Sequence, residues 1–279
     1  MPTTPFQLLR CPIDGNTLTR NDKSWCCEVG HSFDRAREGY VHLLPVQNKR
    51  SKNPGDSKEM VAARRRFLSA GHYAPIAQAL AQMLASHTQG SLSCLDAGCG
   101  EGYYLRELQN MEMDLSILGL DISKWAVQAA AKLDKSSTWV VGSNANLPVV
   151  SATIDFVLCL FGFPMYTEFA RVLKPDGLLV QIDTGKQHLR ELREVIYHSL
   201  KPTRERAPPL EERFSLIEER ALSFEINLES DEAIADLLTM TPHLYRANQE
   251  GKKKAAALHN ISLSIDVHIK CFRINEVRL

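Results

Sequence analysis

The chain has 279 residues, 44% of them apolar, and a formal net charge of zero. It is long enough for one large α/β domain and a small attachment, and its overall charge neither favours nor excludes a nucleic-acid partner. Seven cysteines is an odd number, and no signal peptide or membrane-spanning run stands out. These features exclude a disulfide-rich secreted domain and an integral membrane protein. They predict a cytoplasmic protein with free thiols and no membrane contact.

Residues 1–44 predict a small zinc-ribbon-like module that begins with a flexible tail of about seven residues. Its cysteine and histidine residues lie in two short knuckles about fifteen residues apart, which is the layout of a zinc ribbon. The second knuckle is Cys27-x-x-x-His31. In the first, Asp14 stands where a C-x-x-C pattern would place a second cysteine after Cys11.

Three alternatives follow for the metal. Zinc is held by one full set of four ligands: Cys11, Asp14, Cys27 and His31. Alternatively, Cys26 takes the fourth place instead of the aspartate. In the third alternative the module has lost its metal and its apolar residues hold it together, because a carboxylate ligand is uncommon in closed structural sites.

Residues 45–88 predict a basic linker followed by two helices, one from about Ser57 and one from about Pro75 to Ser86. Basic side chains are concentrated in the linker and the first helix. Because arginine pairs well with phosphate oxygens, this stretch predicts contact with an RNA backbone, whereas a solvated helix face is the alternative. The predicted RNA-binding residues are Lys49, Arg50, Lys52, Arg64, Arg65 and Arg66.

Residues 89–279 alternate between strand and helix patterns, which predicts a mostly parallel sheet covered on both faces. Strands are expected at 92–96, 115–121, 138–142, 154–160, 178–183, 216–228 and 260–270. Helices are expected at 101–110, 123–133, 166–173, 187–199 and 231–240. The Pro- and charge-rich residues 201–213 are expected to form a surface loop.

A glycine-rich turn follows the first of these strands, and it predicts a cofactor site. Residues 96–102 read D-x-G-x-G-x-G, and glycines allow a ligand to lie against the bare backbone. Glu101 would repel a pyrophosphate at this place but would tolerate the positively charged S-adenosylmethionine. Asp121 ends the next strand, where an acid can bind both ribose hydroxyls.

Ligands in such sheets bind at the carboxyl ends of the strands, which gathers further side chains at the same edge. Asn144 or a neighbouring amide is predicted to hydrogen-bond the adenine. Phe161 and Phe163, after the fourth strand, could stack on a substrate base or pack in the core. The catalytic candidates are Asp183, whose alternative role is to cap the following helix, and His188, whose alternative role is to hold the cofactor.

The sequence resembles the bacterial 23S rRNA (guanine-N1-)-methyltransferases, class I S-adenosylmethionine enzymes with an N-terminal zinc-binding module. The resemblance runs from residue 11 to about residue 245. The matching motifs are His31-x-Phe33-Asp34, Glu38-Gly39-Tyr40-Val41, Asn53-Pro54-Gly55-Asp56, Gly71-His72-Tyr73, Asp96-x-Gly98-Cys99-Gly100-Glu101-Gly102-Tyr103-Tyr104, Asp121-Ile122-Ser123-Lys124, His188-Leu189 and Met240-Thr241-Pro242.

The resemblance implies a seven-stranded class I methyltransferase domain, a cofactor pocket lined by Tyr73, Gly100, Glu101 and His188, and zinc ligands Cys11, Cys27 and His31 with Asp14 in the fourth place. The predicted cofactor-binding residues are together Tyr73, Asp96, Gly98, Gly100, Glu101, Gly102, Asp121, Asn144 and His188. The expected reaction is methylation of guanine N1 in a hairpin of 23S rRNA.

N1 lies on the Watson–Crick edge, so the base must be unpaired or extruded. Two alternatives are a small-molecule methyltransferase and a zinc-ribbon RNA-binding protein with an inactive methyltransferase domain. The sequence does not fix the oligomeric state and allows a homodimer.

Overall fold

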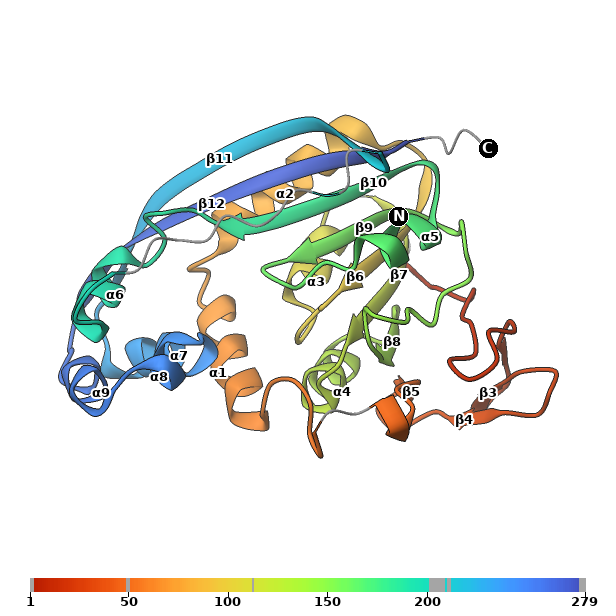
Figure 1. Cartoon of the computed structure of the whole chain (residues 1–279), viewed down its shortest axis with the longest axis horizontal. Coiled ribbons are helices and arrows are strands. Elements are labelled where there is room, and N and C mark those ends of the chain that lie inside the picture. The colour runs from red at the N-terminus through yellow and green to blue at the C-terminus, as the bar shows by residue number, and fades with distance from the viewer. Residues whose placement is uncertain (1–2, 49–50, 112, 201–208, 210–211, 276–279) are drawn as a thin grey trace.

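The computed structural model describes residues 3–48, 51–111, 113–200, 209 and 212–275 (Figure 1). A central sheet carries seven long strands: β6 (Ser91–Ala97), β7 (Asp114–Asp121), β8 (Thr138–Val141), β9 (Ile154–Leu160), β10 (Leu173–Thr184), β11 (Phe214–Leu228) and β12 (Ile261–Ile274). Their order is β11-β12-β10-β9-β6-β7-β8. The pairs from β8 to β10 are parallel, and β12 is antiparallel to β10 and β11. The predicted seven-stranded, mostly parallel sheet is therefore confirmed.

Two short strands of the N-terminal module extend this sheet. They are β1 (Thr4–Pro5), which pairs with β7, and β5 (Val41–His42), which pairs with β8. The expectation of a flexible tail at residues 1–7 is therefore wrong for the described residues 3–7, because Phe6 is buried and its backbone amide donates to the Ile117 carbonyl at 3.4 Å. Between β1 and β5 a separate three-stranded sheet forms the ribbon: β2 (Thr19–Arg20), β3 (Ser24–Cys26) and β4 (Ser32–Asp34).

The helices are arranged around the sheet in two groups (Figure 1). The first group is α2 (Ala74–His87), α3 (Tyr103–Gln109), α4 (Lys124–Leu133) and α5 (Tyr166–Val172). The second group lies beyond one end of the sheet and contains α1 (Lys58–Ser69), α6 (Arg190–Ile196), α7 (Asp231–Met240), α8 (His243–Arg246) and α9 (Gln249–Ala256). The short helices α8 and α9 were not expected, and a one-turn 3-10 helix, η1 (Val46–Asn48), lies in the linker.

Local sequence explains where several of these elements begin and end. Ser57 caps α1 by accepting a hydrogen bond from the Met60 amide at 3.2 Å, as the expected start near Ser57 requires. Helix α6 is shorter than the expected 187–199, because Leu189 has a left-handed backbone at its start and Tyr197 is extended at its end. Strand β10 begins earlier than expected and contains a register shift at its Lys174–Gly177 turn. The loop expected at 201–213 lies mostly outside the described residues.

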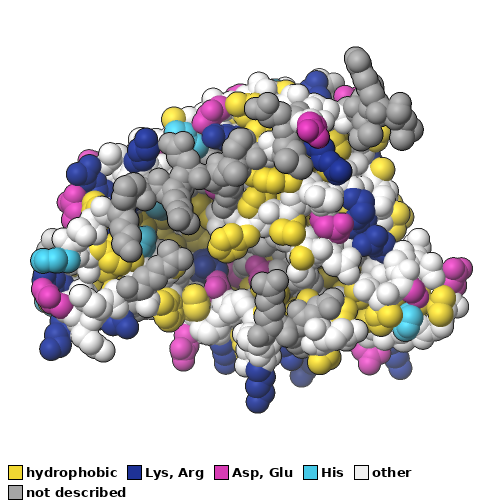
Figure 2. Space-filling view, viewed as in Figure 1, with side chains coloured by type: hydrophobic (Ala, Val, Ile, Leu, Met, Phe, Trp, Pro, Cys, Tyr) yellow, Lys and Arg dark blue, Asp and Glu magenta, His cyan; other side chains and the backbone are white. Residues whose placement is uncertain are grey.

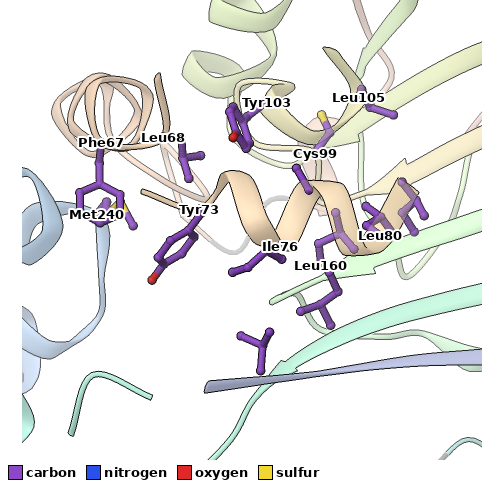
Figure 3. Close-up of a cluster of buried hydrophobic side chains, with 14 of the residues drawn as sticks. Phe67, Leu68, Tyr73, Ile76, Leu80, Cys99, Tyr103, Leu105, Leu160 and Met240 are labelled. Atoms are coloured by element: carbon purple, nitrogen blue, oxygen red, sulfur yellow. The ribbon is translucent and has the colours of Figure 1, made fainter. Parts of the chain in front are cut away.

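Alternate residues of the central strands contribute to two buried clusters, one on each face. One cluster includes Cys94 and side chains of α2, α3 and α4. The other includes Leu95, side chains of α5, and Leu9, Leu18 and Trp25 of the N-terminal module. Figure 3 shows part of the first cluster, in which Phe67 of α1 lies beside Met240 at the end of α7. The N-terminal module thus shares its core with the sheet.

Candidate active site

A cleft of about 1710 Å³ lies at the carboxyl ends of β6, β7, β9 and β10. Its walls come from the glycine-rich loop, the linker before α1, the loop after β9, and residues of α6 and α8. Figure 2 shows hydrophobic side chains exposed in the middle of one face and Lys and Arg side chains along its lower border. The volume exceeds that of an ordinary small-ligand pocket, about 300–1,000 Å³, so the cleft has room for a cofactor and part of a second molecule.

The glycine-rich loop forms the floor of the cleft. The amides of Gly98 and Cys99 both donate to the Leu120 carbonyl, at 2.8 and 3.0 Å, which fixes the loop against β7. Gly98 has φ +112°, and a Cβ added there would meet no atom within 4 Å. The bare backbone of Gly98 therefore faces open space in the cleft, as the predicted cofactor cradle requires.

Asp121 and the linker close one side of this floor. The Asp121 carboxylate accepts from the amides of Gly100 at 2.9 Å and Ser123 at 2.8 Å. Burial raises the pKa of this carboxyl group. The Ser123 hydroxyl donates to the Asp56 carbonyl at 2.7 Å, and Gly55 packs so closely that an added Cβ would lie 2.8 Å from the Ser123 Cβ. The Asn53–Asp56 motif thus holds the linker against the Asp121 loop.

Four buried polar atoms that line the cleft have no hydrogen-bond partner among the described residues. They are Asp96 Oδ1, Glu101 Oε1, the Tyr104 hydroxyl and Asn144 Oδ1. Burial, with a smaller contribution from the nearby Asp121, raises the pKa of Asp96 to about 8. Unsatisfied buried polar atoms are costly, so their concentration in one cleft indicates a polar ligand. The ribose hydroxyls, ammonium group and adenine of S-adenosylmethionine offer suitable partners, so these residues fit this cofactor.

The negative charge of Glu101, which the sequence suggested would face a ligand, is partly offset by Arg106. Its carboxylate forms an ion pair with Arg106 at 2.7 Å, and the same guanidinium binds the Glu101 carbonyl at 2.5 Å. Burial raises the pKa of Glu101, and Arg106 opposes that shift. Arg106 offsets part of the Glu101 charge. Glu101 therefore offers a ligand its second carboxylate oxygen rather than net repulsion.

Tyr73 and His188 form a hydrogen-bonded pair in the cleft. The Tyr73 hydroxyl lies 3.3 Å from His188 Nε2, and the Asp266 amide donates to His188 Nδ1 at 3.3 Å. Because a backbone N–H can only donate, Nδ1 is the acceptor and the proton of the neutral ring lies on Nε2. Burial, with a smaller contribution from the neighbouring His243, lowers the pKa of His188 to about 4. This geometry favours a holding role for His188 over proton abstraction.

The remaining predicted residues differ in whether they line the cleft and in what they contact there. Gly102 precedes α3, and an added Cβ would lie 2.6 Å from Trp139, so this glycine is required by packing as well as by the turn. The Asn144 side-chain amide donates to the carbonyls of Ala97 and Phe163. Thr184, not Asp183, is among the described lining residues. A catalytic role of Asp183 therefore stays a prediction that the cleft geometry does not favour.

Tyr104 and Arg106 belong to the site although they were not singled out from the sequence. Tyr104 is buried in the cleft wall beside the other unsatisfied atoms. The sequence signal for it was its place two residues after the third glycine, at the end of the Asp96–Tyr104 motif. Arg106 lies five positions after Glu101, and Glu101 lies before α3, so the i, i+3 and i, i+4 spacings of a helix did not indicate that the two side chains meet.

Two arginines of the basic stretch, Arg64 and the half-exposed Arg66, are bound to acidic side chains. Arg64 forms an ion pair with Asp56 and donates to the Met240 carbonyl at 3.0 Å. Arg66 makes two hydrogen bonds to Asp236, at 2.5 and 2.8 Å. Lys52 and Arg65 are exposed. Lys49 and Arg50 lie outside the described residues, so phosphate contact by this stretch stays a prediction.

A second cluster lies in the ribbon and has the composition of a metal site. Its ligand atoms, which all lie within 4.8 Å of one another, belong to Cys11, Asp14, Cys27 and His31. His31 Nδ1 is 3.6 and 3.4 Å from the two sulfurs and 2.8 Å from the Asp14 carboxylate. Tetrahedral zinc, with Zn–S of about 2.3 Å and Zn–N of about 2.0–2.1 Å, separates sulfur from nitrogen by about 3.5 Å. The four residues therefore fit zinc.

Cys26 does not belong to this cluster. Its sulfur lies among the side chains of Asn21, Ser24 and Ser32, at 3.3 to 3.7 Å. Cys26 ends β3 and Cys27 follows it, and the Cys27 sulfur has different neighbours, Asp14 Oδ2 at 3.2 Å and His31 Nδ1 at 3.4 Å. The structure therefore places Asp14, and not Cys26, beside the other three candidate ligands, and zinc ligation by Asp14 stays a prediction.

Comparison with known proteins agrees with both sites. Residues 9–52 match the zinc-ribbon family described as "RlmA, N-terminal", and residues 94–177 match the family described as "Methyltransferase domain". Together with the sheet order and the glycine-lined cleft, these matches define an S-adenosylmethionine-dependent methyltransferase with an N-terminal zinc ribbon. No helix in the described part of the chain is long and apolar enough to cross a membrane.

Full-length relatives narrow the class. The 23S rRNA (guanine(748)-N(1))-methyltransferase of Streptomyces fradiae is 30% identical over 269 residues, which cover 92% of this chain and 94% of that protein. A Bacillus subtilis (strain 168) protein named "Putative 23S rRNA (guanine-N(1)-)-methyltransferase YxjB" is 30% identical over 280 residues, 96% of this chain and 97% of that protein. The chain belongs to the family of 23S rRNA (guanine-N1-)-methyltransferases.

Proposed function

We propose that this enzyme transfers the methyl group of S-adenosylmethionine to N1 of a guanine in a hairpin of 23S rRNA. The observation that carries the proposal is the cleft in which Asp96, Glu101, Tyr104 and Asn144 present unsatisfied polar atoms beside the bare glycine loop. The full-length similarity to the Streptomyces fradiae enzyme supports guanine N1 of 23S rRNA as the acceptor.

The protein contributes to catalysis mainly by positioning. Bound S-adenosylmethionine supplies an electrophilic methyl group on its sulfonium. The glycine loop, Asp121 and the four unsatisfied side chains hold the donor in one orientation, and the cleft leaves space beyond them for a base. Holding donor and base in one cleft would replace a bimolecular encounter with a preorganised one, which lowers the barrier substantially.

N1 carries a proton at neutral pH, so that proton must leave during the reaction. His188 is a weak acceptor for it, because its pKa is lowered to about 4 and Nδ1 already accepts the Asp266 amide. We assign His188 to orienting the Tyr73 hydroxyl. With Nε2–H donating to Tyr73, the hydroxyl proton of Tyr73 is directed to another acceptor in the cleft.

RNA selection is assigned to the N-terminal part of the chain. We propose three regions: residues 1–44 as the ribbon that contacts RNA, residues 45–88 as the basic linker with its helices, and residues 89–279 as the methyltransferase domain. Exposed Lys52 and Arg65 lie in the second region, where they can reach phosphates. The bacterial relatives, and seven cysteines that form no disulfide in the described structure, support a cytoplasmic location.

The decisive experiment has two measurements on the purified full chain. Calorimetry measures S-adenosylmethionine binding, and a radiolabelled methyl donor measures transfer to 23S rRNA that lacks the modification. Primer extension then maps the modified guanine, since a methyl group on the Watson–Crick edge stops the polymerase. Cofactor binding without transfer to any RNA would contradict the proposal and favour the small-molecule alternative. Sedimentation of the same sample tests the homodimer that the sequence allows.

A further inference from the structure

The loop after β9 carries an exposed aromatic side chain at the mouth of the cleft. Phe163 is 85% exposed, whereas Phe161 is 37% exposed. Both residues line the cleft together with Met165. Exposing a phenylalanine to water forgoes the stabilisation that its burial would give. The position of Phe163, beside the donor site and not on a remote surface, indicates that a ligand covers it.

The loop is held in a fixed shape that presents these rings. The Phe161 amide donates to the Ile182 carbonyl at 2.9 Å, and Asn144 donates to the carbonyls of Ala97 and Phe163. Phe161 has φ +56°, a left-handed conformation that is rare for a bulky residue and is concentrated at functional sites. Asn144 therefore joins the end of β6, which carries the glycine loop, to the backbone of Phe163.

Phe161 belongs to an aromatic wall inside the cleft. Its ring centre lies 6.4 Å from each of the rings of Tyr73, Tyr104 and His188. Tyr104 is also one of the residues with an unsatisfied polar atom. The wall thus reaches from the donor site toward the loop after β9, where Phe163 also lines the cleft.

We infer that Phe163 stacks on the extruded guanine and that Phe161 forms the inner wall against which this base rests. The inference rests on the proposed function and names the residue that positions its acceptor. An extruded base loses its neighbours in the RNA stack, and an aromatic side chain can replace one of them. Every base has a π-face, so Phe163 contributes affinity for the base, while selection of guanine comes from polar groups deeper in the cleft.

The test compares Phe163→Ala, Phe163→Leu and Phe163→Trp with the wild-type enzyme, using unmodified 23S rRNA as substrate. Stacking contributes about 1–3 kcal/mol per base, so Phe163→Ala is expected to lower kcat/KM by roughly 5- to 150-fold. We expect the loss mainly in KM for RNA. Phe163→Trp should retain activity near wild type and Phe163→Leu should not, because tryptophan keeps a π-face and leucine does not.

Two controls separate this role from others. The affinity for S-adenosylmethionine should stay within twofold of wild type in all three variants. Leu216→Ala, which removes another exposed apolar side chain (51% exposed) on β11, should leave kcat/KM unchanged. Because Phe163 is so exposed, its truncation should not alter the unfolding temperature.

Three results would overturn the inference: Phe163→Ala with kcat/KM within twofold of wild type, Phe163→Leu as active as Phe163→Trp, or a loss of cofactor affinity that matches the loss of activity. Each of these requires a wild-type enzyme that methylates rRNA. Absence of transfer by the wild type would instead contradict the proposed function, so the two failures are distinguishable.

Discussion

Asp96 is a residue whose unpaired carboxylate suits a ligand but lowers the stability of the cofactor-free protein. It is buried at the end of β6, and one of its carboxylate oxygens has no partner among the described residues. Burial, with a smaller contribution from the nearby Asp121, favours the protonated form of this carboxyl group and raises its pKa to about 8. A bound ammonium group would supply the missing positive charge. The same feature predicts a measurable pH dependence of stability.

We expect the cofactor-free protein to lose stability as pH rises from about 4 to about 8. In this range the folded state holds a proton on Asp96 that the unfolded chain, with a pKa of about 3.9, has released. Each pH unit in this range then lowers the free energy of unfolding by about 1.4 kcal/mol. Relative to Asp96→Asn, wild type should lose roughly 2 kcal/mol between pH 6 and pH 8, measured by urea unfolding. Parallel pH profiles for the two proteins would contradict this prediction.

Tyr73 and His188 should behave as one unit in cofactor binding. Removing either partner of their hydrogen bond is expected to weaken S-adenosylmethionine affinity by about 1 kcal/mol, or roughly fivefold. Because both variants remove the same interaction, the double variant Tyr73→Phe/His188→Ala should be little worse than either single one. Calorimetry on the four proteins measures the coupling. Additive losses would show that the two side chains contact the ligand independently.

At the scale of elements, helix α1 joins regions of the chain that are far apart in sequence. Arg64 connects the linker residue Asp56 to the end of α7, and Arg66 holds Asp236, a buried carboxylate in the middle of α7. Between them, Arg65 is exposed. Three consecutive arginines therefore have different tasks, since successive side chains of a helix point about 100° apart.

Arg65→Gln and Arg66→Gln form a matched pair that separates these tasks. Arg66→Gln leaves the buried Asp236 carboxylate without its partner and should lower the free energy of unfolding by about 1–3 kcal/mol. Half-exposure of Arg66 keeps the expected loss at the lower end of that range. Arg65→Gln should leave stability unchanged, weaken RNA binding, and reduce the slope of log K against log salt by about one. The opposite assignment of effects would refute this division.

The same helix shows what the sequence could and could not predict. Its start at Ser57 and its buried face followed from local signals, the cap and the helical spacing of Phe67 with its neighbours. The partner of Arg66 lies 170 residues away, so local pattern could not distinguish a structural arginine from one available to phosphate. Likewise, the glycine loop and Asp121 were predictable from spacing, but Tyr104 entered the site only through the packing of α3 on the sheet.

At the scale of the whole molecule, the N-terminal module is packed into the methyltransferase fold and is not a separate domain with its own core. Strands β1 and β5 pair with β7 and β8, and Leu9 and Trp25 share a core with the sheet. The sequence predicted a separate module because its composition changes near residue 44. It could not reveal strands of two residues, whose pairing depends on a sheet formed later in the chain. Loss of zinc should therefore disturb the domain that carries the cleft as well as the ribbon.

Replacing Asp14 tests this connection and the identity of the metal site together. We expect purified wild type to contain one zinc per chain by elemental analysis. Asp14→Ala should release zinc faster to a chelator and lower the unfolding temperature of the whole chain in a single transition, because the ribbon and sheet share a core. Asp14→Cys should release zinc more slowly, since thiolate is the commoner ligand in closed zinc sites. Cys26→Ala is the matched control and should behave as wild type.

A fully folded wild-type protein without zinc would rule out a structural role for the metal, and a ribbon that unfolds separately from the sheet would contradict the shared core.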